Sequence, residues 1–215
     1  MCRKAKDSKR LRSTTRPTFA TWLGLFRDKK RILDLGSGEL GGFPLARGAQ
    51  VTRVDIQPRF RPAAVADAQR LPFKDSSFDA VLAMSVLEHV PRPWLAVEEI
   101  RRILRSGGLV LGYVPFMYPY HADASFHDYY RFTGEALHSL FDRFDSIEII
   151  SAGGYANVML RFMVGFTASQ RHPLRAEKLV SKFLAGISRA TGIWRSTRVR
   201  GLRRSPTGYN FLARK

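Results

Sequence analysis

The stretch from Arg31 to Glu39, Arg-Ile-Leu-Asp-Leu-Gly-Ser-Gly-Glu, constrains the fold of this chain more than any other. Its apolar residues are typical of a buried parallel strand, and its two glycines let the chain turn sharply with the backbone exposed to a ligand. Val51 to Asp55 is a second apolar strand, and its terminal acid lies 21 residues after Asp34. In a doubly wound α/β sheet, an acid at this place binds the ribose of a nucleotide-like cofactor. The two strands together predict a nucleoside site.

Further short motifs follow in a fixed order. They are Ala66-Asp67-Ala68 with Leu71-Pro72-Phe73, Phe78-Asp79-Ala80-Val81, Leu87-Glu88-His89-Val90 and Leu104-Arg-Ser-Gly-Gly-Leu109. With Ile32–Gly38 and Val54-Asp55-Ile56, this series resembles the class I S-adenosylmethionine-dependent methyltransferases, most closely their type 11, small-molecule branch. The resemblance covers about residues 31–150. The chain departs from the family pattern at Leu40, where the family's loop usually has a third glycine.

The resemblance implies an α/β fold with a Rossmann-like, doubly wound, seven-stranded sheet, mostly parallel with an antiparallel last strand. It implies S-adenosyl-L-methionine as the cofactor, with Asp55 on the ribose hydroxyls and Asp67 on the adenine amine beside the backbone of Ala68. The alternative for Asp55 is a cap at the strand end. Asp34 would order the glycine loop or contact the amino acid end of the cofactor through its neighbours. The expected cofactor-binding residues are Asp34, Gly36, Ser37, Gly38, Asp55, Ile56, Asp67, Ala68 and Ser85.

Local patterns predict the other elements. Residues 14–27 carry apolar residues at helical spacing, and the resemblance implies a helix over the cofactor side of the sheet, whereas a plain packing helix fits the pattern equally well. A helix is expected from Pro93 to Arg105, with Trp94, Val97, Ile100 and Leu104 on its buried stripe. Thr133 is expected to cap a helix to Phe141. Strands are expected near 64–66 and at 78–85, 109–114, 147–151 and 208–213, with a short helix around 45–48.

The chain has 215 residues and a formal net charge of +18. The length predicts one domain over residues 14–215, with a basic disordered tail at 1–13 and a basic, helical insertion or cap at 155–206 before the last strand. Residues 1–31 carry 11 Lys and Arg against 2 acids, residues 171–215 carry 12 against 1, and the middle carries 13 against 15. Any attraction to a polyanion therefore belongs to the two ends and not to the core.

The composition also predicts a cytoplasmic protein. The single cysteine, Cys2, cannot form an intrachain disulfide, which fits a reducing compartment. The longest apolar stretch, 155–168, is interrupted by Arg161 and is too short to span a membrane, and the N-terminus lacks the apolar core of a signal peptide. Without a Cys/His cluster of zinc spacing, the sequence predicts no metal site.

Three histidines are the candidates for catalysis. His89 follows the fourth expected strand, where the family places acceptor-facing residues, although a histidine there is as often a lid over the cofactor. His121 and His127 lie in the aromatic segment 115–131, just past the carboxyl end of the fifth strand, where Asp128 could orient an imidazole as a general base. Alternatively, Asp128 and its neighbours only lock this segment by hydrogen bonds. The sequence favours a base in segment 115–131 over His89.

The predicted function is methyl transfer to an oxygen of a small molecule or glycan, including a lipid-linked glycan. Similar methyltransferases with a His-Asp-Tyr-x-Arg-Phe segment occur in glycan assembly. The net charge favours an RNA or DNA methyltransferase as the alternative, but the Asn/Asp-Pro-Pro-Tyr-like tetrapeptide of amino-methylating enzymes is absent after the fourth strand, where the chain reads Ser85-Val-Leu-Glu-His89. The missing third glycine keeps open a second alternative, an inactive methyltransferase fold that serves as an interaction subunit.

The basic insertion has two interpretations. Apolar residues at helical spacing between 179 and 194, flanked by lysines and arginines, suit a helix that lies on an anionic membrane surface at the cytoplasmic face. The same pattern suits a lid that packs over the acceptor cleft, which is the commoner fate of such a helix in a globular protein.

Overall fold

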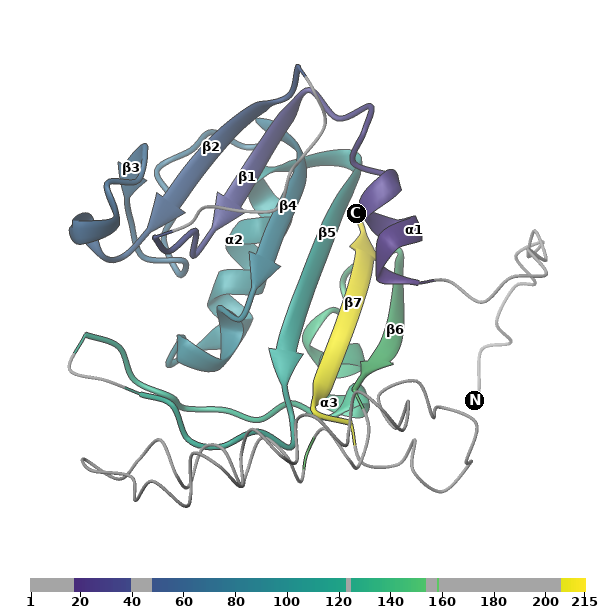
Figure 1. Cartoon of the computed structure of the whole chain (residues 1–215). Helices are drawn as coiled ribbons and strands as arrows, with labels where there is room; N and C mark the ends of the chain where they lie inside the picture. The colour runs from purple at the N-terminus through teal and green to yellow at the C-terminus, as the bar shows by residue number, and fades with distance from the viewer. Residues whose placement is uncertain (1–17, 40–47, 123–124, 154–157, 159–205) are drawn as a thin grey trace, which may run out of the picture.

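A single mixed sheet forms the centre of the fold in the computed structural model of the chain, which describes residues 18–39, 48–122, 125–153, 158 and 206–215. The strand order is β3-β2-β1-β4-β5-β7-β6 (Figure 1). The strands are β1 (Arg31–Leu35), β2 (Gln50–Asp55), β3 (Ala64–Val65), β4 (Phe78–Met84), β5 (Leu104–Pro115), β6 (Ser146–Ala152) and β7 (Gly208–Arg214). Strands β1 to β5 pair in parallel, and β7 lies antiparallel between β5 and β6. The predicted seven-stranded fold with its antiparallel last strand is confirmed.

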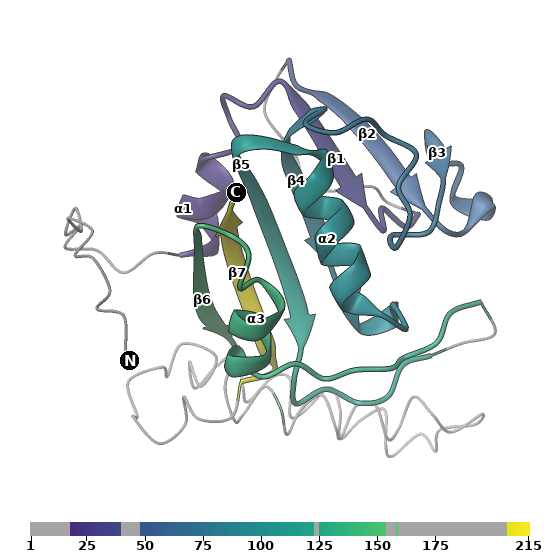
Figure 2. The same ribbon diagram turned by 180° about the vertical axis from the view of Figure 1, so that it is seen from behind.

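The two faces of the sheet bury different side chains because successive residues of a strand point to opposite sides. On one face, Leu33, Val81 and Val110 pack with helices α2 (Pro93–Ile103) and α3 (Gly134–Leu140). On the other face, alternate strand residues pack with Trp22 and Phe26, which belong to or follow helix α1 (Phe19–Gly24); these strand residues are Ile32, Ala80, Leu82, Leu109, Leu111 and Leu212. Figure 2 shows α2 and α3 together on the face away from α1.

Helix α1 supports the packing interpretation of the N-terminal pattern. Its Thr18 cap accepts a hydrogen bond from the backbone N–H of Thr21, and Trp22 is buried against the sheet. No residue of α1 lines the pocket described below. The expected short helix around 45–48 and the departure at Leu40 lie wholly or mostly outside the described residues, as do the tail at 1–13 and nearly all of the insertion at 155–206.

Helix α2 corrects two expectations. It ends at Ile103 and not at Arg105, because Leu104 already pairs with Phe78 of β4 as the first residue of β5. Its buried stripe consists of Ala96, Val97, Ile100 and Ile103 after Pro93, whereas Trp94 is 51% exposed. Successive helix residues point roughly 100° apart, so Trp94 points away from Pro93 and the buried stripe. Its spacing of three residues from the buried Val97 is therefore not enough to bury it.

The segment between β5 and α3 runs past the carboxyl ends of the parallel strands (Figure 1). It ends at Thr133, whose Oγ1 accepts a hydrogen bond from the Ala136 N–H, so the predicted cap of α3 is confirmed. Two short 3-10 helices, η1 (Pro58–Phe60) after β2 and η2 (Leu87–His89) after β4, lie at the same edge of the sheet. Among the described residues, no helix has the length and apolar character needed to cross a membrane.

Candidate active site

The glycine loop after β1 is tied to the end of β2. The N–H groups of Gly36 and Ser37 donate to the Val54 carbonyl at 2.8 and 3.1 Å, and both Gly36 and Gly38 have left-handed φ angles. The buried Asp55 carboxylate accepts the Gly38 N–H at 2.9 Å with one oxygen and the Gln57 N–H at 2.8 Å with the other. The acid at the tip of β2 is therefore held against the glycine loop.

A pocket of about 450 Å³ opens beside this loop. Seven of the nine residues that the sequence assigns to the cofactor line it: Gly36, Gly38, Asp55, Ile56, Asp67, Ala68 and Ser85. Asp34 and Ser37 do not line it. Asp34 is buried at 4% exposure within β1.

Asp67 lies at the rim of this pocket and is exposed. One oxygen of its carboxylate accepts the Gln69 backbone N–H at 2.9 Å, and the other accepts the Gln69 side-chain amide at 2.9 Å. These bonds fix a turn that leads into the buried Ala68. The turn presents a carboxylate and a backbone edge side by side on one wall.

The aromatic segment 115–131 forms another wall of the pocket, through Ser125, Phe126, His127 and Tyr129. Near its tip, the Gln57 amide donates to the Ser125 carbonyl and the Arg59 guanidinium donates to the Ser125 hydroxyl at 2.8 Å. The segment thus reaches across to the turn that follows β2.

The returning half of this segment is fixed by an ion pair and by backbone bonds. Arg131 binds both oxygens of Asp128, at 2.6 Å for the Oδ2 contact, and also donates to the carbonyls of Tyr118 and Pro119. The backbone N–H groups of residues 129 and 130 donate to the Glu88 carbonyl at 2.8 and 3.2 Å. The structure therefore contains hydrogen bonds of the kind that the sequence suggested could lock the segment 115–131 through Asp128 and its neighbours.

Asp128 also orients an imidazole, but that of His121 and not the neighbouring His127. Its Oδ2 accepts the His121 backbone N–H at 3.0 Å and lies 3.1 Å from His121 Nδ1. Burial alone would raise the pKa of Asp128, but the hydrogen bonds from Arg131 and His121 outweigh it and hold the pKa at about 2. An ionised Asp128 makes His121 Nδ1 the donor and leaves its Nε2 unprotonated in the neutral ring.

His89 meets His121 edge to face, with ring centroids 4.9 Å apart. Its Nδ1 lies 2.6 Å from the His127 carbonyl, which can only accept, so Nδ1 carries the proton. Burial lowers the pKa of His89, and the nearby His121 lowers it further, against the opposing effect of the His127 carbonyl. His89 is therefore neutral at pH 7 with a free lone pair on Nε2, and its ring lines the pocket.

Glu88 is a fully buried carboxylate next to these rings. Its Oε1 lies 3.8 Å from His89 Nε2, and neither carboxylate oxygen has a hydrogen-bond partner among the described residues. Burial raises the pKa of Glu88 to about 8, helped by the charge of Asp128 and opposed by its own backbone N–H, by Arg131 and by the Ser85 hydroxyl. From the sequence, Glu88 was expected beside His89 among the acceptor-facing residues, but nothing in the order Leu-Glu-His shows that the acid turns inward.

Comparison with known proteins agrees with this geometry. Residues 33–112 match the model of the type 11 methyltransferase family, described as "Methyltransferase domain". Over these residues the chain is similar to the class I S-adenosylmethionine-dependent methyltransferases of type 11. An uncharacterized methyltransferase of Mycobacterium sp. (strain KMS) is 38% identical over a region that covers 42% of this chain and 41% of that protein. The chain thus spans about two fifths of the length of the curated relatives it matches.

Solved structures share this architecture. A SAM-dependent methyltransferase from Archaeoglobus fulgidus superposes with a TM-score of 0.55 at 15% identity, over 92% of this chain and 91% of that one. A phosphoethanolamine N-methyltransferase 2 from Haemonchus contortus, solved with S-adenosyl-L-methionine, gives a TM-score of 0.54 at 21% identity, over 91% and 51%. At these identities the likeness shows the fold alone.

The fold brings two of the three predicted catalytic histidines to the pocket wall, His89 and His127. His121 does not line the pocket, but it contacts His89 from the other side. From the sequence, the general base was sought either at His89 or in the segment 115–131. In the structure these candidates are in contact, because His89 meets the ring of His121 and the carbonyl of His127.

Proposed function

We propose that the protein transfers a methyl group from S-adenosyl-L-methionine to an oxygen of a small molecule or glycan. The observation that carries the proposal is the Asp55 carboxylate, held at the glycine loop on the wall of the 450 Å³ pocket. Its two backbone hydrogen bonds leave lone pairs for two further donors, because an ionised carboxylate offers about four acceptor sites. The hydroxyls of a ribose are such a pair of donors.

The pocket suits the rest of this cofactor. The backbone of Ala68 and the carboxylate of Asp67 form a wall that can meet an adenine amine, and apolar groups such as Ile56 and Val90 cover the ring faces. Bound S-adenosyl-L-methionine supplies a methyl carbon attached to a sulfonium, whose transfer needs chiefly alignment with the nucleophile.

The histidines support an oxygen acceptor. A hydroxyl must lose a proton as it becomes an ether, and neutral His89, with its Nδ1 fixed by the His127 carbonyl, presents a free lone pair for hydrogen bonding. Exposed aromatic rings lie in the same segment, Tyr129 at 47% and Tyr120 at 74%. Flat rings that are accessible to solvent suit stacking on a sugar or another ring.

The pocket wall argues against a nucleic-acid acceptor despite the charge of +18. None of the described residues that line it is Lys or Arg, and Asp55 and Asp67 are both acidic. A wall that holds a phosphate backbone close to the transferred methyl group needs the opposite charge. The positive charge is concentrated at the two ends of the chain, and it supports at most salt-sensitive, sequence-independent attraction.

Calorimetric titration with S-adenosyl-L-methionine tests the cofactor half. Asp55→Ala should weaken binding at least tenfold, because loss of a charged hydrogen-bond acceptor costs about 1.5–3 kcal/mol. Asp142→Ala, which removes an exposed acid of the loop after α3, is the matched control and should bind like wild type. Equal affinity of Asp55→Ala and wild type would overturn the assignment.

A screen of hydroxyl-bearing acceptors, scored by release of S-adenosylhomocysteine, tests the acceptor half. Turnover of small phenols, sugars or lipid-linked glycans supports the proposal. Turnover confined to RNA or DNA would contradict it and favour the nucleic-acid alternative. Tight cofactor binding without turnover of any class would favour an inactive interaction subunit.

A further inference from the structure

Glu88 is the buried acid that the described residues satisfy least. Its side chain has 0% exposure, and neither carboxylate oxygen makes a hydrogen bond of normal length with a described residue, although its own backbone N–H and the Ser85 hydroxyl lie near enough to influence its pKa. A buried carboxylate in this condition is costly, and native structures usually satisfy such a group with a donor, a water or a cation. The methyl transfer proposed above does not use Glu88, so its placement calls for its own explanation.

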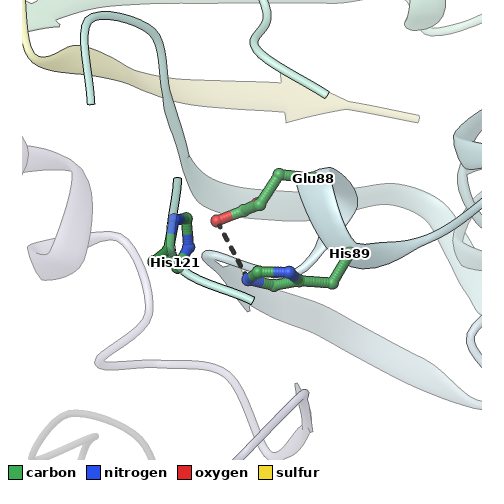
Figure 3. Close-up of side chains that lie close together, drawn as sticks. All are labelled: Glu88, His89 and His121. Atoms are coloured by element: carbon green, nitrogen blue, oxygen red, sulfur yellow. Dashed lines mark ion pairs between the residues drawn. The ribbon is translucent and has the colours of Figure 1, made fainter. Parts of the chain in front are cut away.

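Two imidazoles face this carboxylate. Figure 3 shows the Glu88 side chain pointing toward the rings of His89 and His121, which come from η2 and from the segment 115–131. One donor atom from each of the three residues lies within 4.8 Å of the other two, and the Glu88 Oε1 to His89 Nε2 distance is 3.8 Å. The three groups converge on one point from two separate parts of the chain.

The Nδ1 atoms of both imidazoles are occupied by acceptors behind the rings. His89 Nδ1 donates to the His127 carbonyl at 2.6 Å, and His121 Nδ1 lies 3.1 Å from the Asp128 carboxylate. Metal-binding histidines almost always donate their second ring N–H to a carbonyl or carboxylate in this way, which fixes the tautomer and the ring orientation. Both Nε2 atoms are thereby left as ligands.

We propose that Glu88, His89 and His121 bind one divalent transition-metal ion of the zinc class, with at least one coordination position left open. Two imidazole nitrogens and one carboxylate oxygen are a recurrent ligand set for catalytic zinc and for other first-row metals. Magnesium and calcium prefer sites made of oxygen alone, so this set disfavours them. The sequence did not indicate the site, because its ligands lie 32 residues apart at positions 89 and 121 and carry no motif spacing.

The geometry and the charges permit binding with small movements. Ligands of a tetrahedral zinc ion lie roughly 3.4 Å from one another, so the widest pair here would close by roughly 1 Å or slightly more. His121 lies on the segment 115–131 and can supply that movement. Arg131 approaches His121 Nδ1 to 3.4 Å, but its charge is offset by the paired Asp128.

The site would act on the acceptor, a consequence that rests on the proposed function. His89 belongs to both the metal site and the pocket wall. An acceptor hydroxyl bound at the open position would lose its proton to solvent more readily, because a bound zinc ion lowers the pKa of a coordinated oxygen strongly. The oxygen would then form its bond to the methyl carbon while the carbon–sulfur bond breaks and sulfur keeps the electron pair.

Metal binding is measured on the untagged, full-length protein after treatment with a chelator. Equilibrium dialysis against Zn²⁺ should give about one bound ion per chain. Co²⁺ bound in place of Zn²⁺ should show the visible absorption bands of an ion that is held by nitrogen and oxygen ligands. Glu88→Gln and His121→Gln should each weaken binding at least tenfold. His138→Ala on the exposed surface of α3 is the matched control and should bind as wild type does, with unchanged turnover.

Failure of this inference and failure of the proposed function give different results. If Zn²⁺ does not bind, or binds wild type and both folded variants alike, the metal site is excluded, even where the enzyme turns over its acceptor. If Zn²⁺ binds as expected but S-adenosyl-L-methionine does not, the proposed function fails and the metal site stands. Thermal melting verifies folding, and His121→Gln, on a partly exposed residue, serves as the test if Glu88→Gln does not fold.

Discussion

Gly36 and Gly38 share left-handed φ angles of +66° and +55°, yet their surroundings differ. A Cβ at Gly36 would lie 2.5 Å from Val86 Cγ2, whereas a Cβ at Gly38 would meet no atom of the described residues within 4 Å. Gly38→Ala should therefore lower the free energy of unfolding by about 1–2 kcal/mol, through backbone strain alone. Gly36→Ala adds an overpacking cost of about 1–3 kcal/mol.

Urea unfolding of the two variants measures this difference. Each serves as the control for the other, because both place the same methyl group on the same loop in the same backbone region. Equal losses of stability would show that Val86 moves aside at no cost, and that the close packing between the loop and the residues after β4 is not what requires Gly36.

The single residues that the sequence predicted best belong to local motifs. Gly36, Gly38 and Asp55 could be placed because a strand, a turn and an acid at a fixed distance determine their position within one βαβ unit. The pairing of His121 with Asp128, and the approach of His121 to Glu88, could not be placed. Both depend on how segment 115–131 folds back across the end of β4, which no short-range pattern encodes.

Helix α2 is fastened to the loop before β4 by one ion-pair network. Glu99 accepts from the Arg102 guanidinium at 2.7 and 2.8 Å and from the Leu71 N–H at 2.8 Å, while Arg102 also donates to the carbonyls of Leu71 and Phe73. The hydrogen bonds from Arg102 lower the pKa of Glu99, helped by the Leu71 N–H and opposed by burial. The carboxylate form therefore stabilises the fold.

The pH dependence of stability follows from this shift. A carboxyl whose pKa is lower in the folded state contributes stability above its unfolded value, and that contribution is lost as pH falls through the folded value. Glu99→Gln should lower the free energy of unfolding by about 1–2 kcal/mol at pH 7. The difference from wild type should shrink as pH falls below the ordinary value of 4.5.

Chemical unfolding of wild type and variant between pH 7 and about pH 4 is the measurement. Glu98→Gln is the control, because its ion pair with Arg143 joins exposed side chains and contributes little to stability. A gap between Glu99→Gln and wild type that widens toward low pH would contradict the prediction, since it would require the protonated acid to be the stabilising form.

At the scale of elements, the sequence predicted type and order better than ends. Strand β4 and the Thr133 cap could be placed because a run that is apolar apart from Asp79 and a capping residue are local signals. The exposed Trp94 and the early start of β5 at Leu104 could not, because each depends on a neighbouring element. Trp94 borders a second cavity between α2 and α3, lined also by Arg101 and Arg143.

For the whole molecule, sheet register fixes where the insertion is attached. Gly208 of β7 pairs with Ala152 of β6 and with Pro115 of β5. The chain beyond β6 therefore leaves, and returns to β7, at the carboxyl edge of β5, where the segment 115–131 also begins. The Phe116 N–H donates to the Thr207 carbonyl at 2.9 Å, which joins the two attachments. Both interpretations of residues 155–206 thus start from the carboxyl edge of β5, beside the segment 115–131.

This attachment makes the membrane interpretation specific, although the insertion itself lies outside the described residues. If its apolar residues enter an anionic bilayer interface, the acceptor side of the pocket faces the lipid, which suits a lipid-linked hydroxyl. The protein should then co-sediment with anionic vesicles at low salt and much less with neutral ones, because each Lys or Arg near the surface contributes about 1 kcal/mol.

Double charge reversal, Lys178→Glu with Lys182→Glu, should reduce sedimentation at least tenfold, since it removes two cations and adds two anions. The matched control is Arg70→Glu with Lys74→Glu on the exposed loop before β4, which makes the same change of net charge far from the insertion in sequence. If both double variants lose binding equally, the attraction is a property of net charge, and if wild type fails to bind anionic vesicles, the insertion acts as a lid over the acceptor side.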